Sequence, residues 1–249
     1  TVPLVFKTPE GVEVIKTFTF KQGDYPITVK HQVVNRSAQN WQGQMFGQLK
    51  RDNSDDPGKS SQGIFTLGTF LGGAWGTPEA TYNKLKFSNF SDEKLSLEAK
   101  GAWVAMVQHY FVSAWIPGNL KLTQADGQPY TAKLESRQST DKMNIIGFTS
   151  PVINVPAGTS MEVDAKLYAG PKIQSELKDL AVGLNQTVDY GWLWPIAKLL
   201  FIGLQFFHNI IGNWGWSIIL LTVLVKLILW PLSAKSYRSM AKMRMIAPE

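Results

Sequence analysis

The chain has 249 residues, a formal net charge of +6 and no cysteine, and 44% of its residues are hydrophobic. The lack of cysteine excludes disulfides, thiolate metal sites and a cysteine nucleophile. A mean hydropathy close to zero excludes a protein made mostly of membrane spans. The apolar weight is concentrated in residues 192–232, whereas residues 1–185 have the composition of a soluble domain large enough to bury its own core.

The first fifty residues alternate apolar and polar side chains, which predicts β-strands. Residues 12–20 and 25–34 each place apolar side chains on one face. A third strand follows, with Trp41, Gly43, Met45 and Gly47 on one side. The polar segment 50–63 then predicts an exposed loop.

The run 103–116 is apolar without alternation and reaches Pro117-Gly118, where we expect it to end. A strand that is apolar on both sides is typical of one covered on both faces of its sheet. This run therefore predicts strands at the centre of the domain.

Strand patterns continue over residues 142–149 and 161–168, and Asp126-Gly127 predicts a hairpin turn. Short strands separated by turns about every ten residues favour a mostly β fold, an all-β sandwich. Residues 172–184 carry apolar side chains at helical spacing and predict a helix at the end of this domain. We place the domain at residues 1–185.

Residues 186–212 predict a polar connector followed by an amphipathic helix that lies in the membrane surface. Pro195 fits the first helical turn. The helix is apolar except for a narrow polar stripe, flanked by a histidine: Lys198, Gln205 and Asn209, with His208 beside them. The alternative is a second transmembrane span. It is disfavoured because Gly212-Asn213 is a very short link and the polar stripe would face lipid.

Residues 213–233 predict one transmembrane helix. From Trp214 to Trp230 the segment has 17 residues, or roughly 25 Å of helix, close to the hydrocarbon thickness of a bilayer. Indole rings favour the boundary between water and lipid, so five tryptophans are candidate membrane-interface anchors: Trp192, Trp194, Trp214, Trp216 and Trp230. One cation, Lys226, lies inside the apolar run.

Residues 234–249 begin a basic region with four cations opposed only by Glu249: Lys235, Arg238, Lys242 and Arg244. Positive charge directly after a span predicts that this end is cytoplasmic and that the large N-terminal domain is outside, in the periplasm of a bacterium. Contact with anionic lipid is a compatible use of the same charges. A nucleic-acid patch is disfavoured because the cluster adjoins a membrane span.

The chain begins at Thr1 with no export signal and stops just after a basic run. A domain outside the membrane needs such a signal, so we expect this chain to be part of a longer protein.

Several motifs resemble the YidC family of bacterial membrane protein insertases. The most specific are residues 189–192, Asp-Tyr-Gly-Trp, and residues 239–244, Ser-Met-Ala-Lys-Met-Arg. The resemblance covers the whole chain. It implies a periplasmic β-supersandwich of galactose-mutarotase type, an interfacial helix, and the first of five core spans in the bacterial inner membrane. It also implies that nascent membrane proteins are the substrates and that the Sec translocon and its accessory subunits are partners, with no cofactor and no enzymatic step.

The family most often has arginine where this chain has Lys226, facing a polar groove that opens to the cytoplasm. The resemblance implies that Lys226 attracts the polar tail of a substrate, with Thr222 on the same face of the helix. Two alternatives stay open. Lys226 lies about 6 Å along the axis from Trp230, so its stem could reach the headgroups. Thr222 could bond to its own helix carbonyl instead.

A different class of function is a membrane-tethered periplasmic protein that binds sugars or acts as a mutarotase. Such chemistry needs acidic and basic side chains that converge in a cleft. The soluble part offers His31, on the apolar face of a strand, and His109, within an apolar run. Both positions are more typical of packed core histidines. The sequence contains no metal-ligand spacing, nucleophile elbow or phosphate loop, which disfavours this alternative.

Overall fold

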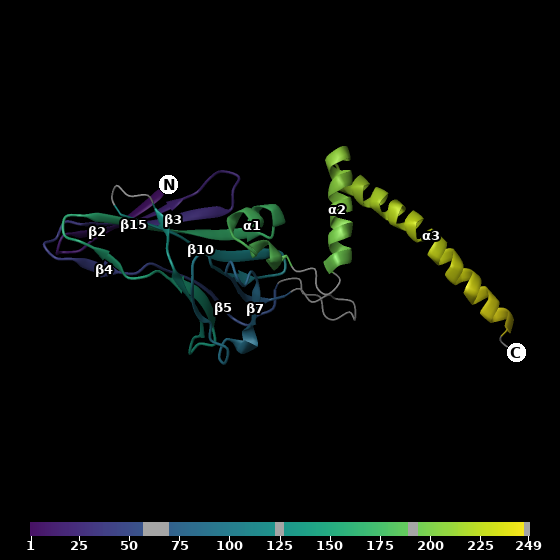
Figure 1. Ribbon diagram of the computed structural model, residues 1–249, viewed down its shortest axis with the longest axis horizontal. Helices are drawn as coiled ribbons and strands as arrows, with labels where there is room; N and C mark the ends of the chain where they lie inside the picture. Colours follow the sequence, from purple (N-terminus) through teal and green to yellow (C-terminus); the bar gives the residue numbers. More distant parts are fainter. Residues whose placement is uncertain (57–69, 123–126, 189–193, 247–249) are drawn as a thin grey trace. The chain divides into compact units, whose positions relative to one another are not determined.

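The computed structural model describes residues 1–56, 70–122, 127–188 and 194–246. The chain divides into two compact units, Thr1–Asp189 and Tyr190–Glu249. The first unit is built mostly of strands and the second of two helices (Figure 1). The predicted mostly β class is confirmed.

The larger sheet is antiparallel and contains nine strands among the described residues. Eight of them lie in the order β1-β2-β3-β15-β10-β9-β6-β7, and β11 pairs with β10. Their bounds are β1 Val2–Lys7, β2 Val12–Thr19, β3 Pro26–Asn35, β6 Gly72–Gly76, β7 Asn83–Lys86, β9 Trp103–Val107, β10 Phe111–Leu122, β11 Gln128–Pro129 and β15 Ser160–Pro171. A short 3-10 helix, η1 (Phe87–Asn89), follows β7.

A smaller antiparallel sheet has the order β5-β13-β12-β8, and β4 pairs separately with β14. The bounds are β4 Trp41–Gly43, β5 Phe46–Arg51, β8 Ser96–Ala99, β12 Ala132–Gln138, β13 Asn144–Thr149 and β14 Ile153–Val155. The prediction of one strand through Trp41 and Gly47 is therefore wrong, because the chain leaves one sheet after Gly43 and enters the other at Phe46. Gly47 is required there, since a Cβ would overlap the rings of Phe148 and Trp115.

The core lies on both sides of β9, whose residues are all buried. Val104 and Met106 pack with residues of the smaller sheet, including Ile146. The alternate residues of β9, Trp103 among them, pack with Leu177 from the helical end of the unit. The two-sided burial predicted from the run 103–116 is confirmed for β9, because a sheet covers one face and helical turns cover the other. Residues 109–111 of the run are exposed.

The predicted end of this run at Pro117-Gly118 is wrong. Strand β10 continues to Leu122, and its pairing with β15 shifts register between Pro117 and Leu120. Asp164 of β15 stabilises this bulge, because its Oδ1 accepts a hydrogen bond from the backbone N–H of Asn119 at 2.6 Å.

The predicted helix over residues 172–184 is shorter in the structure. Helix α1 covers Gln174–Leu180, and a 3-10 turn, η2, covers Leu184–Thr187. Between them Gly183 has a φ of +81°, and a Cβ there would overlap Thr81 O. The interruption is fixed by the core, because Trp103 Nε1 donates to Val182 O at 2.8 Å.

The helical unit contains α2 (Trp194–Ile211) and α3 (Trp214–Ile246). Gly212, with a φ of +70°, ends α2, and its N–H donates to His208 O at 2.7 Å. Asn213 caps α3, since its Oδ1 accepts from the N–H of Gly215 at 2.8 Å. The rings of His208 and Trp214 stack at 3.8 Å across this corner.

Helix α3 is continuous for 33 residues and passes through Pro231. Among the described residues, its stretch Trp214–Met240 is the one that is long and apolar enough to cross a membrane. The apolar part of α2, Pro195–Ile211, is shorter. The segment predicted as a span and the basic residues after it therefore belong to one helix.

Candidate functional site

One side of α3 packs against α2. Ser217 is fully buried, and Leu221 and Val225, one and two turns further on, are half-buried. A Cβ at Gly203 of α2 would lie 3.0 Å from Leu221 Cδ1, so the small residue permits close packing at this point. Residues spaced four apart share a helix face, and this face of α3 is therefore the one that α2 covers.

Three further polar residues of α3 lie on another side. At about 100° per residue, Thr222, Lys226 and Ser233 fall within a stripe about 40° wide. Lys226 is nine residues after Ser217, and this spacing places it about 180° around the helix axis from the residue buried against α2. All three stripe residues are exposed. The structure therefore brings Thr222 and Lys226 together on a face that α2 leaves uncovered.

Thr222 makes the intrahelical bond that the sequence left open as an alternative. Its Oγ1 donates to Ile218 O at 2.7 Å. The hydroxyl proton is therefore engaged within α3. The oxygen keeps acceptor capacity towards the stripe.

The charge of Lys226 is not balanced by its own pair of helices. Residues 190–248 include six Lys and Arg residues and no Asp or Glu. A carboxylate partner for Lys226 is therefore lacking in both α2 and α3. A lone ammonium without such a partner is costly in hydrocarbon.

The structure describes the side chains of three of the five tryptophans predicted as membrane-interface anchors. Trp214 and Trp216 occupy the first turn of α3, and Trp230 lies one turn after Lys226; all three are exposed. Trp192 lies outside the described residues. Trp194 is the first residue of α2, but its side chain lies outside the described part. Two groups of indoles thus flank the apolar part of α3, 14 residues apart from Trp216 to Trp230.

The predicted basic region continues α3 beyond Pro231. Lys235 and Arg238 are three residues apart and exposed. Lys242 and Arg244 lie on the same helix, and their side chains are outside the described part. The cationic positions therefore extend along a helix rather than along a loop.

The two histidines of the β unit do not form an acid–base site. His31 lies in the middle of β3, paired with Lys16 and Val163 on the neighbouring strands. Burial, with a smaller effect of the Lys16 charge, lowers the pKa of His31 to about 4. His109 is exposed, so its expected place in the core is wrong; it lies in the turn between β9 and β10, outside the covered part of the sheet. No group of three potential metal ligands occurs among the described residues.

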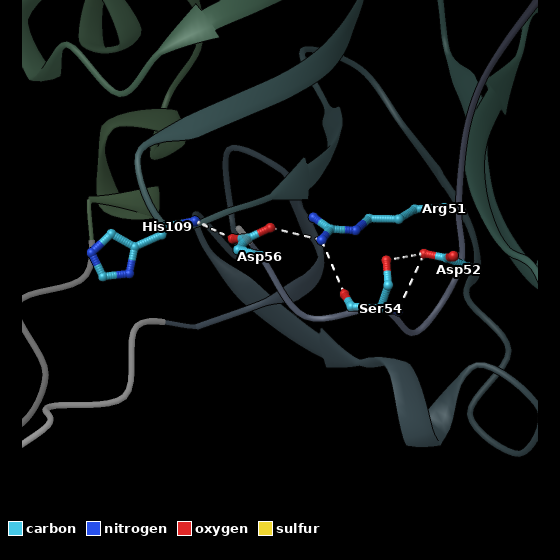
Figure 2. A network of polar contacts seen from close by, with 5 residues as sticks. All are labelled: Arg51, Asp52, Ser54, Asp56 and His109. Carbon is cyan, nitrogen blue, oxygen red and sulfur yellow. Dashed lines mark hydrogen bonds and ion pairs between the residues drawn. The ribbon is translucent and has the colours of Figure 1, made fainter. Parts of the chain in front are cut away.

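Sequence reasoning missed a mostly buried ion pair at the end of β5. Arg51 and Asp56 are each only 13% exposed, and Arg51 Nη2 lies 2.7 Å from Asp56 Oδ1. Arg51 Nη2 also donates to Ser54 O at 3.1 Å, and Asp56 Oδ2 accepts from the N–H of His109 at 2.7 Å (Figure 2). Burial opposes ionisation of Asp56, but the bonds from Arg51 and His109 outweigh it and lower the pKa of this carboxyl group.

This ion pair borders a cleft of about 380 Å³ between the two sheets. The cleft is lined from β5 and the loop after it, and from β9 and β10: Leu49, Lys50, Arg51, Ser54, Asp55, Met106, Gln108 and Ser113. The polar composition of residues 50–63 predicted only an exposed loop. It gave no indication that Arg51 and Asp56 fold inward.

Comparison with known proteins gives matches along nearly the whole chain. The family described as YidC periplasmic domain matches residues 1–202, and the family described as 60Kd inner membrane protein matches residues 206–249. The membrane protein insertases YidC of Pseudomonas entomophila and Pseudomonas putida are each 48% identical over 239 residues. That of Azotobacter vinelandii is 46% identical over 239 residues.

Each of these alignments covers 96% of this chain and 41% of the relative, so the chain spans about two fifths of their length. Among solved structures, a putative aldose 1-epimerase from Klebsiella pneumoniae matches with 8% identity and a TM-score of 0.35. That match covers 75% of this chain and 52% of the epimerase chain. The family matches at both ends agree with the motifs at residues 189–192 and 239–244, and the chain belongs to the YidC family.

Proposed function

We propose that the protein containing this chain inserts newly made proteins into the bacterial inner membrane. Support comes from the family itself, whose relatives are named membrane protein insertases. The match of residues 206–249 to an inner membrane protein family and the long apolar helix α3 support the same location. Insertion moves a segment from water to lipid, so it requires no covalent step, nucleotide or cofactor.

The membrane arrangement is part of this proposal. Residues 1–185 form a periplasmic domain, 186–212 a connector and interfacial helix, and 213–233 the span, and 234–249 begin a cytoplasmic region. The basic positions after Pro231 favour the cytoplasmic side. The lipid-boundary tryptophans at both ends of the span, and the polar stripe of α2, favour these depths.

The observation that carries the proposed mechanism is the polar stripe of α3. A lysine at the middle of a span costs roughly 2.5–3.5 kcal/mol on insertion scales. Lys226 nevertheless lies inside the apolar run, between its middle and Trp230, beside Thr222, on the face that α2 does not cover and without a carboxylate in α2 or α3. We infer that the rest of the protein encloses this stripe as a hydrated groove open to the cytoplasm.

In this groove Lys226 attracts the acidic or polar extracellular tail of an incoming protein. The tail enters the membrane partway while the apolar segment of the substrate moves into lipid. Burial of that segment supplies the driving force. The groove shortens the low-dielectric path that the tail must cross, which is where the energetic barrier lies.

The partners follow from the same proposal. Nascent membrane proteins and the lipid bilayer contact the helical unit. Cooperation with the Sec translocon and its accessory subunits rests on the family resemblance. Nucleic acid is not among the proposed partners.

Charge reversal in the full-length protein tests the groove. With Lys226→Glu, we expect insertion of a substrate with an acidic tail to fall at least tenfold. We expect Lys226→Arg to retain insertion, because it keeps the charge. Lys235→Glu is the matched control, since it reverses one charge of the same helix outside its apolar part. Undiminished insertion by Lys226→Glu, or an equal loss with Lys235→Glu, contradicts the mechanism.

A further inference from the structure

The cleft beside Arg51 is lined by Leu49, Lys50 and Arg51 of β5, an edge strand. β5 pairs with β13 on one side, and among the described residues no strand pairs with its other side. In an antiparallel strand, successive residues direct their N–H and C=O groups to alternate sides. Every second residue of β5 therefore directs its main-chain groups to the unpaired side.

Two hydrogen bonds show which residues of β5 direct their main-chain groups towards β13 and which direct them away. Ser150 N–H donates to Met45 O at 2.8 Å, so Met45 faces the β13 side. Gln48 O accepts from Trp115 Nε1 of β10 at 3.4 Å, so Gln48 faces the unpaired side. The odd-numbered residues of β5 therefore bond to β13, and Phe46, Gln48 and Lys50 direct their main-chain groups away from it.

Lys50 is the member of this unpaired set that lies in the cleft together with Arg51. No hydrogen bond to the main chain of Lys50 is found within the part of the chain that the structure describes. Arg51 adds a directed donor, because its Nη2 is engaged with Asp56 and Ser54 while its buried Nη1 has no hydrogen-bond partner among the described residues. Figure 2 shows both dashed contacts on the same terminal nitrogen of Arg51.

We propose that this cleft binds a short extended peptide, which adds as a strand to the edge of β5 that no described strand pairs with. The peptide exchanges main-chain hydrogen bonds with Lys50, and one of its carbonyl groups accepts a bond from Arg51 Nη1. Leu49 and Met106 provide an apolar contact for one small side chain. The volume of about 380 Å³ is at the lower end of the range of roughly 300–1,000 Å³ for ligand sites.

The charges of the cleft favour a peptide main chain over an anion. Lys50 and Arg51 are accompanied by Asp55 in the lining, and Asp56 pairs with Arg51 beside it, so these four residues together carry no net charge. The lining residues also include no aromatic side chain on which a sugar ring could stack. A peptide backbone presents alternating neutral donors and acceptors, which matches an unpaired strand edge.

Given the proposed function, the source of this peptide is an exported segment of an inserting protein. The binding site itself does not depend on that function. Binding is measured with a capped pentapeptide of alternating serine and valine, by calorimetry on the full-length protein in lipid nanodiscs. Insertion is measured in a separate assay. Failure of peptide binding and failure of insertion can therefore be distinguished.

The decisive variant is Lys50→Pro, which removes the outward N–H without breaking the ladder to β13. We expect peptide affinity to fall at least tenfold. Phe46→Pro is the matched control, because it makes the same change at an outward position that does not line the cleft. We expect its affinity to stay within twofold of the original. Equal affinity of Lys50→Pro and the original protein, or an equal loss in both variants, overturns the proposal.

A second measurement does not depend on folding of a variant. Two versions of the pentapeptide carry N-methyl groups on alternate amides, one on the serines and one on the valines. Strand addition uses one set only, so one version must lose binding and the other must keep it. Equal binding of both versions overturns the proposal, as does binding of lactose by a cleft that does not bind the peptide.

Discussion

Asn35→Ala removes a buried amide that joins three segments of the β unit. Asn35 Nδ2 donates to Gln39 O at 2.7 Å and to Val155 O at 2.9 Å, and Oδ1 accepts from Ser37 N–H at 3.0 Å and Ser37 Oγ at 2.7 Å. Asn35 and Val155 are both fully buried. A buried group left without a partner costs about 1–3 kcal/mol, so we expect a total loss of about 2–4 kcal/mol in the free energy of unfolding.

Pulse proteolysis of the full-length protein across a urea series measures this loss. With a slope of about 2 kcal/mol/M, the unfolding midpoint of the β unit should fall by about 1–2 M urea. Asn40→Ala is the control at the same corner, because Asn40 is exposed and the bond that its Oδ1 accepts among the described residues, from Ala157 N–H, is long at 3.4 Å. We expect it to change the free energy by less than about 0.5 kcal/mol. A midpoint for Asn35→Ala equal to that of Asn40→Ala would refute the reasoning.

Two further predictions concern His31 and Thr222. The pKa of His31 is about 4 in the folded unit and about 6.5 when unfolded, so the unfolded chain binds more protons between these values and stability falls as pH drops through this window. His31→Gln should remove on the order of 1 kcal/mol of this pH dependence, after allowance for partial exposure; urea series at pH 7 and pH 5 test it, and an unchanged difference between the two contradicts it. Thr222→Val should reduce insertion only two- to threefold, because the hydroxyl proton already bonds to Ile218 O; a loss as large as that of Lys226→Glu contradicts this subordinate role.

The class of the β unit follows from sequence because its patterns are local. Alternation predicts β2 and β3, and the uninterrupted apolar run predicts the two-sided burial of β9. The errors arise where distant residues decide. Asp164 accepts a hydrogen bond from the N–H of Asn119, and this bond stabilises the continuation of β10 beyond Pro117-Gly118. Trp103 donates a hydrogen bond to the carbonyl of Val182, and this bond fixes the interruption of the predicted helix.

In the candidate site, too, features set by local sequence are predictable, whereas features that depend on distant residues are not. The spacing of Thr222 and Lys226 on one helix face follows from the sequence, since helical periodicity is local. Which face of α3 is covered does not, because it depends on how Gly203 and Leu221 meet. The ion pair of Arg51 and Asp56 was missed because polar residues in a loop give no sign of turning inward.

The central claim, that Lys226 lies in a hydrated groove, is tested most directly by the water content at its position. A single cysteine at position 226, spin-labelled in an otherwise cysteine-free full-length protein, reports contact with deuterated water by electron spin-echo modulation. Leu227 is the matched control, because it lies about 1.5 Å further along the axis and about 100° around it. The account predicts clearly stronger deuterium modulation at 226 than at 227; equally weak modulation at both positions would contradict it.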